Sequence, residues 1–169
     1  HGSLIEDLFA YIPRHRADDI IYFNPADTER PMGLNMLEAK SDEERDLIAL
    51  DAMNMMVKMF GEEIFGPRIQ DYFRNGCLTL MADQDEGGAI TDLVRLFTDD
   101  EWQKYKVAKV KNPIVKSFWD KQMAQTGQRE RQEMIPYFAA KFGQFTTNAL
   151  IRNIVGQTKS SFDFTDVMN

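Results

Sequence analysis

Apolar residues recur at helical spacing over most of the chain beyond residue 40. In the helix predicted from the capping box at Ser41 to Phe60, nearly every position from Leu47 onward is apolar, apart from Asp51, Asn54 and Lys58, which form a narrow polar stripe with Glu44. A helix that is apolar around most of its circumference is usually buried on all sides, so this pattern predicts a central helix. Its four methionines are interpreted as adaptable core residues in preference to a promiscuous binding groove.

The same spacing, together with N-terminal capping signals, predicts the other helices of this region. Pro67 suits a first helical position, and the apolar rhythm that follows runs to Leu80 and includes Cys77, which is therefore expected in the core. Residues 83–88 are predicted to form a turn. Later helices are expected to start at Thr91–Asp92, at Thr98 as a capping box, at Asn112–Pro113, at Glu130 and at Thr147, and Gly156 is expected to close the last one.

One segment has the character of a β-strand. Ile20–Phe23 is a short apolar run bounded by Asp18–Asp19 and Asn24–Pro25, which is typical of a buried strand. A loop containing proline and glycine follows it up to Asn35. The fold class expected from the whole pattern is mainly α: a compact domain of six to seven helices with one short N-terminal strand.

Charge is distributed unevenly around a net value of −7. Residues 1–100 hold 21 acidic and 9 basic side chains, whereas residues 101–169 hold 6 acidic and 11 basic ones. A basic surface attracts nucleic-acid backbones by counterion release, although exposed helix faces also carry lysines simply as solvated side chains. The candidate residues for binding nucleic acid or a partner are Lys104, Lys109, Lys111, Lys116, Lys121, Arg129, Arg131, Lys141, Arg152 and Lys159.

Catalytic groupings are missing from the sequence. Gly87–Gly88 lacks the lysine of a phosphate-binding loop, and the paired carboxylates lie at helix ends, where they cap amides. One cysteine and two histidines cannot form a zinc site of the usual kind. No apolar run approaches the ~20 residues of a membrane span. We therefore expect a non-enzymatic, cytoplasmic chain with no catalytic residue, metal or cofactor of its own.

Six short runs spread along the chain share the character of a single family. They are His1–Leu4, Ile12–Pro13, Asp19–Asp27, Arg30–Asn35, Phe65–Arg68 and Arg152–Gln157. Together these runs resemble the coupling-protein ATPases of bacterial conjugation and type IV secretion, members of the FtsK-like P-loop ATPase group. In that family an all-α domain interrupts a nucleotide-binding domain.

The resemblance implies a division of the chain into three parts. Residues 1–35 would be a remnant of the nucleotide-binding domain, residues 36–158 the all-α domain, and residues 159–169 a tail leading back to the first domain. ATP and Mg²⁺ belong to the resembled parent, and the phosphate-binding loop and the Mg²⁺-binding strand would lie before His1 and after Asn169. The parent would be a membrane-anchored hexamer at the cytoplasmic face of the bacterial inner membrane.

The implied function is recognition of cargo before translocation, either DNA or its protein escort, such as a relaxase or an effector. Two alternatives remain open. The chain could be a protein-interaction module whose acidic first half, including Asp42, Glu43 and Glu44, receives basic tails of effectors or adaptors. It could also be a structural insert that helps the subunits of a ring to pack together.

Overall fold

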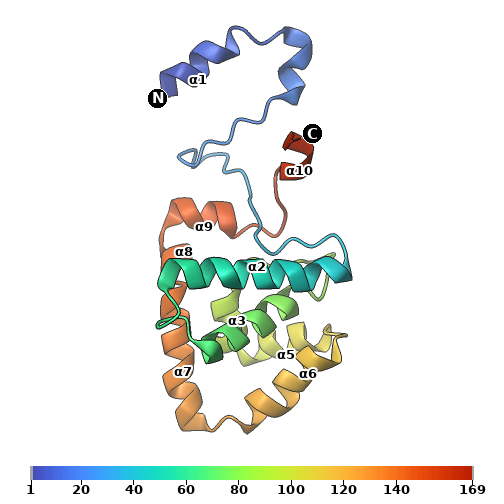
Figure 1. The fold of residues 1–169 in the computed structure, drawn as a ribbon, viewed down its shortest axis with the longest axis vertical. Coiled ribbons are helices and arrows are strands. Elements are labelled where there is room, and N and C mark those ends of the chain that lie inside the picture. The colour runs from blue at the N-terminus through green and yellow to red at the C-terminus, as the bar shows by residue number, and fades with distance from the viewer. Residues whose placement is uncertain (1, 169) are drawn as a thin grey trace.

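Helices supply all the regular structure of the part of the chain that the structure describes. The computed structural model describes residues 2–168, and the side chains of residues 4–167 apart from those of 128, 144 and 164. Within this range there are ten α-helices, one 3-10 helix and one π-helical turn, and no β-strand (Figure 1). The expectation of a mainly helical fold is confirmed, although the helices are shorter and more numerous than predicted.

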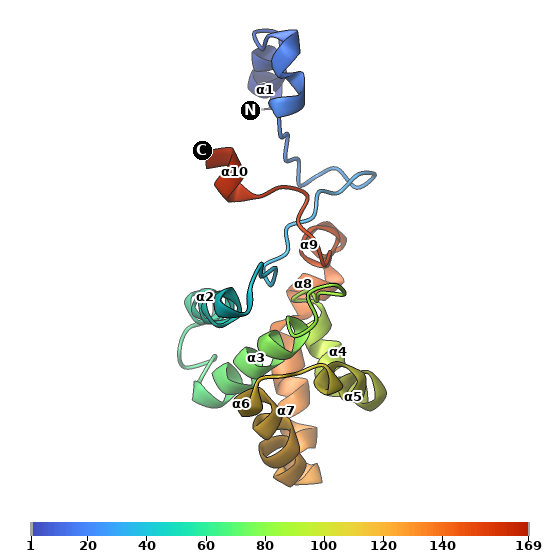
Figure 2. The same cartoon turned by 90° about the vertical axis from the view of Figure 1, so that its right-hand side faces the viewer.

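The predicted helix from Ser41 to Phe60 is confirmed as α2 (Asp42–Phe60). The Ser41 hydroxyl accepts a hydrogen bond from the amide of Glu44 at 3.3 Å, and the Glu44 carboxylate accepts one from the amide of Lys40 at 2.8 Å. The prediction that this helix is central is wrong. Only its Ala49, Ala52 and Met56 are buried, because the helix packs by one side and lies at the flank of the molecule (Figure 2).

The central helix is instead α3 (Pro67–Leu80), which buries eight of its residues. Cys77 is fully buried there, as predicted, and burial raises the pKa of its thiol. A glycine at position 76 lets the next helix, α4 (Asp92–Thr98), approach closely. A Cβ atom at Gly76 would lie 2.7 Å from Leu93 Cδ2, so any other residue would require the side chain of Leu93 to shift.

Of the three helix starts predicted in the middle of the chain, the one at Thr91 lies where it was predicted but lacks a side-chain cap bond, and the one at Thr98 is displaced by one residue. The cap of α5 (Asp100–Ala108) is Asp99, whose carboxylate accepts from the amide of Trp102 at 3.0 Å. Thr98 belongs to the end of α4, because its hydroxyl donates to the carbonyl of Val94. A carboxylate one residue later therefore replaces the predicted threonine.

The last third of the chain wraps α3 with aromatic side chains. Asn112 caps α6 (Pro113–Ser117), as predicted, and this helix continues into the π-helical turn η2 (Phe118–Met123). The single helix predicted from Glu130 is divided into α7 (Gln128–Lys141) and α8 (Gly143–Thr147). The rings that pack around α3 include the pairs Phe73–Phe142, Phe97–Phe138 and Tyr72–Phe118.

The N-terminal residues extend away from this helical body (Figures 1 and 2). They comprise α1 (Gly2–Phe9), the 3-10 helix η1 (Arg14–Asp19) and an irregular chain that follows. Residues 20–23, for which a strand was predicted, lie outside any helix or strand. A strand needs a neighbour to satisfy its backbone groups, and residues 2–168 offer none, so the strand remains a prediction for a larger α/β unit.

Candidate interaction site

The helical body is joined to the rest of the chain by two segments that lie side by side. We call residues 31–38 the incoming segment and residues 154–163 the outgoing segment. The Leu34 amide donates to the carbonyl of Ile154 at 3.0 Å, and the Ser161 amide donates to that of Gly33 at 2.9 Å. The Ser161 hydroxyl in turn accepts from the Gly33 amide at 2.7 Å. The chain thus enters and leaves the helical body at one place.

The close approach of these segments depends on Gly33. A Cβ atom at this position would lie 2.6 Å from the carbonyl oxygen of Lys159 and 2.7 Å from the side chain of Gln157. The outgoing segment contains the end of α9 (Ala149–Val155) and leads to α10 (Phe164–Met168). The predicted tail from Lys159 is therefore, in its first part, a paired segment.

Asn35 joins the two segments to the core. Its side-chain amide is buried and donates to the carbonyls of Gly88, at 3.0 Å, and Thr158, at 2.9 Å. The side-chain oxygen of Asn35, Oδ1, accepts from the backbone amide of Leu37 at 2.9 Å. One side chain therefore links the incoming segment, the outgoing segment and the turn before α4. A pocket of about 350 Å³ lies beside it, lined in part by Glu38 and Ser160.

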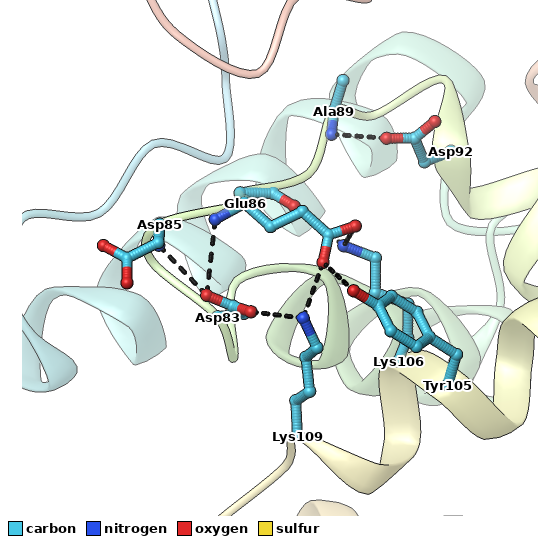
Figure 3. Close-up of polar contacts among 9 residues, drawn as sticks. Asp83, Asp85, Glu86, Ala89, Asp92, Tyr105, Lys106 and Lys109 are labelled. Atoms are coloured by element: carbon cyan, nitrogen blue, oxygen red, sulfur yellow. Dashed lines mark hydrogen bonds and ion pairs between the residues drawn. The ribbon is translucent and has the colours of Figure 1, made fainter.

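The turn at residues 83–88 is held by an ionic cluster that it forms with α5 (Figure 3). Lys109 Nζ lies 2.5 Å from Asp83 and 2.9 Å from Glu86, while Lys106, only 2% exposed, pairs with Glu86 at 2.9 Å. The Tyr105 hydroxyl donates to the same Glu86 carboxylate. The turn predicted from Gly87–Gly88 is confirmed, and Gly87 adopts a φ of 68°.

The cluster shifts the pKa values of its members in opposite directions. Hydrogen bonds from Lys109, followed by those from Lys106 and Tyr105, outweigh desolvation and lower the pKa of Glu86 to about 2. The Lys109 side chain also lowers the pKa of Asp83, and these two acids raise the pKa of Lys109. The charges of both lysines are therefore paired with acidic side chains of the turn. The cluster thus supports the loop between α3 and α4.

Several of the ten candidate basic residues are paired with acids of the chain itself. Besides Lys109, Lys104 lies 2.8 Å from Glu101 and Arg129 lies 3.5 Å from Glu133. Neutralised side chains contribute less to an electrostatic surface than free ones. These three residues are consequently weaker candidates for binding nucleic acid than the sequence suggests.

Four other candidates are engaged with polar or aromatic groups, or are partly buried. Arg152 donates to the carbonyl of Thr146 and Lys159 to that of Gln84. Lys141 Nζ lies 4.1 Å from the centre of the Tyr137 ring. Arg131 has a buried Nε that lacks a hydrogen-bond partner among the described residues.

The remaining three candidates are Lys111, Lys116 and Lys121, which lie between α5 and the end of η2. All three are exposed, and none forms an ion pair with a residue in the described range. Their part of the chain, next to α6, lies at the opposite end of the helical body from α9 (Figure 1). The structure therefore separates Arg152 and Lys159 from the lysines of α6 and η2.

Sequence reasoning did not identify the residues that join the two segments. Asn35, Ser160 and Gly33 are separated from their partners by as many as 128 positions, and no periodicity links them. The available signals were local: a Pro–Gly loop at residues 31–33 and two adjacent serines in a chain region without helical pattern. These features indicate irregular polar segments, but they do not indicate that the segments pair.

The described residues contain no group of three or more histidine, cysteine or acidic side chains that could hold a metal ion. None of the described helices combines the length and apolar character that crossing a bilayer requires. No family model, curated protein or solved structure matches this chain.

Proposed function

We propose that this chain is the cargo-recognition, all-α domain region of a coupling ATPase of conjugation or type IV secretion. It would bind DNA or a protein escort and carry no nucleotide hydrolysis of its own. The proposal rests on the resemblance of the sequence runs and on a helical body with segregated charge. ATP and Mg²⁺ would act in the nucleotide-binding domain of the parent protein.

The single observation that supports this proposal best is the pairing of the incoming and outgoing segments. An all-α domain that interrupts another domain must begin and end close together, because both ends connect to the same host domain. The hydrogen bonds between Gly33 and Ser161, and from Leu34 to Ile154, give this chain such a geometry. The apolar N-terminal residues that precede the incoming segment, which we call the N-terminal arm, extend from the body. In this proposal they would belong to the host domain.

Binding to DNA would use the charges that the chain does not neutralise itself, on Lys111, Lys116 and Lys121. The test is a titration with single- and double-stranded oligonucleotides over a range of salt concentrations. Each phosphate contact should contribute about −0.7 to −0.9 to the slope of log affinity against log salt. The triple variant K111Q/K116Q/K121Q should bind more weakly and with a shallower slope.

A matched control for this titration is the triple variant K58Q/K104Q/R129Q. It removes the same formal charge from exposed positions, two of which are already paired with acids. Equal losses in both triple variants would mean that net charge alone governs binding. No binding at low salt would exclude DNA as the cargo and leave the protein escort.

A second candidate function is the protein-interaction module, and one specific observation favours it. The acidic helix α2 exposes two leucines, Leu47 and Leu50, which nucleic acid does not need and a protein partner does. Titration with basic peptides distinguishes this function from DNA binding, since an acidic surface repels phosphates.

A further inference from the structure

The solvent-exposed side of α2 combines leucines with acidic side chains. Seven residues at three- and four-residue spacings lie on this side, and all seven are exposed. We call them the outer face of α2: Glu43, Asp46, Leu47, Leu50, Asp51, Asn54 and Lys58. Leu47 is 63% exposed and Leu50 is 41% exposed. Because they are three positions apart, they form one continuous apolar contact area.

The opposite side of α2 already provides the contact with the helical body. It buries Ala49, Ala52 and Met56, and α3 is the main helical neighbour. Within the described part of the chain, no element covers the outer face (Figure 2). The two leucines are thus not required for packing on α3.

The charge of this region limits what can cover the face. Residues 41–63 include seven acidic and two basic side chains. Glu43 and Asp51 flank the leucines, Asp46 beside them lies 3.6 Å from Arg74 of α3, and Lys58 at the far end is the only cation of the outer face. A second copy of the same face would bring like charges together, and a nucleic acid would be repelled. A partner with apolar side chains in the middle and cations at the edges is complementary to it.

We propose that the outer face of α2 docks a basic amphipathic helix of a partner protein. In such a complex the apolar stripe of the partner would lie over Leu47 and Leu50, and its lysines or arginines would face Glu43 and Asp51. The inference deepens the proposed function, on which it rests, by naming the chemistry of a protein cargo or adaptor. The small apolar area makes the contact weak and dependent on salt.

The test is a titration of the whole chain with a short synthetic peptide of leucine and lysine arranged at helical spacing. The variant L47Q/L50Q should bind about tenfold more weakly, because each glutamine replaces apolar contact area. The variant E43Q/D51N should bind more weakly and with less dependence on salt. All four positions are exposed, so both variants should fold, and circular dichroism and thermal unfolding check this.

Matched controls use exposed residues elsewhere in the molecule. I114Q/L150Q replaces two exposed apolar side chains outside α2, and D120N removes an acid from η2; neither should alter binding. A peptide of the same composition without helical periodicity should bind poorly. Hydrogen exchange should show protection of residues 43–58 by the amphipathic peptide.

Three outcomes would overturn the inference. They are unchanged binding by L47Q/L50Q, equal losses in I114Q/L150Q, and a dimer of the chain that L47Q/L50Q abolishes, which would assign the face to a second copy. The failure of the broader proposal is a separate result, because DNA binding is tested at Lys111, Lys116 and Lys121, away from α2. Failure of the unchanged chain to bind the peptide, with DNA binding intact, is a fourth result against this inference, and it would reject this inference alone.

Discussion

Glu86 is a residue at which the local fold depends on pH. Its pKa in the folded chain is about 2, below its usual 4.5, because Lys109, Lys106 and Tyr105 donate hydrogen bonds to the carboxylate. A carboxyl group with a lowered pKa stabilises the fold fully above about pH 4.5. As the pH falls from 4.5 to 2, the unfolded chain binds a proton that the folded chain does not, so this stabilisation is lost.

We therefore expect the free energy of unfolding to fall with decreasing pH over this window, and to fall less steeply in the variant E86Q. Urea unfolding at a series of pH values measures both slopes. The control is E101Q, which replaces an exposed glutamate whose side chain is 86% accessible. A wild-type slope in E86Q would mean that the ion pairs of Glu86 are too well solvated to stabilise the fold.

At the residue scale, the sequence predicted side chains whose role is set by nearby positions. Cys77 lies in an apolar helical stripe, and its complete burial follows from that periodicity. The buried cation Lys106 was not predicted, because its partner Glu86 lies on a different element and the separation of 20 positions has no sequence signature. The role of Asn35 was missed for the same reason, because its partners Gly88 and Thr158 are distant in the sequence.

At the scale of elements, helix starts were likewise predicted correctly where the signal is local in the sequence. The caps at Ser41 and Asn112 were correctly predicted, since a capping side chain and the amide it accepts from lie within three residues. The start of α5 was misplaced by one residue, because Thr98, Asp99 and Asp100 are all plausible caps. Tertiary packing of α4, which continues through Thr98, decides among them.

The cap of α5 leads to a prediction that separates the two assignments. The variant D99A should lose about 1 kcal/mol of unfolding free energy, because the amide of Trp102 loses its acceptor. T98A should lose less, since its hydroxyl only donates to a carbonyl that is already within a helix. Chemical denaturation of both variants measures the difference, and a larger loss in T98A would support the cap predicted from the sequence.

At the scale of the whole molecule, the helical body and the N-terminal arm differ in how much of their apolar surface is buried. The helical body closes over a continuous core of aromatic and aliphatic side chains, whereas the N-terminal arm leaves many of its large apolar side chains exposed. The large apolar residues that this arm exposes are Leu4, Ile5, Leu8, Phe9, Tyr11, Ile20, Ile21 and Tyr22. Such surface is stabilised by covering it, either by a host domain or by another copy of the chain.

The isolated chain is therefore expected to associate through its arm as concentration rises, with the segment Ile20–Phe23 contributing unpaired backbone groups. Light scattering across a wide range of concentrations should show a rising mean mass. The variant L8S/I21S should reduce it, whereas I114S, which changes an isolated exposed side chain on α6, should not. Phe23 is a poorer site for the test because its ring already packs against Phe162. A constant monomer mass would mean that the apolar side chains of the arm can stay exposed to water without causing association. The argument for a host domain would then rest on the paired segments alone.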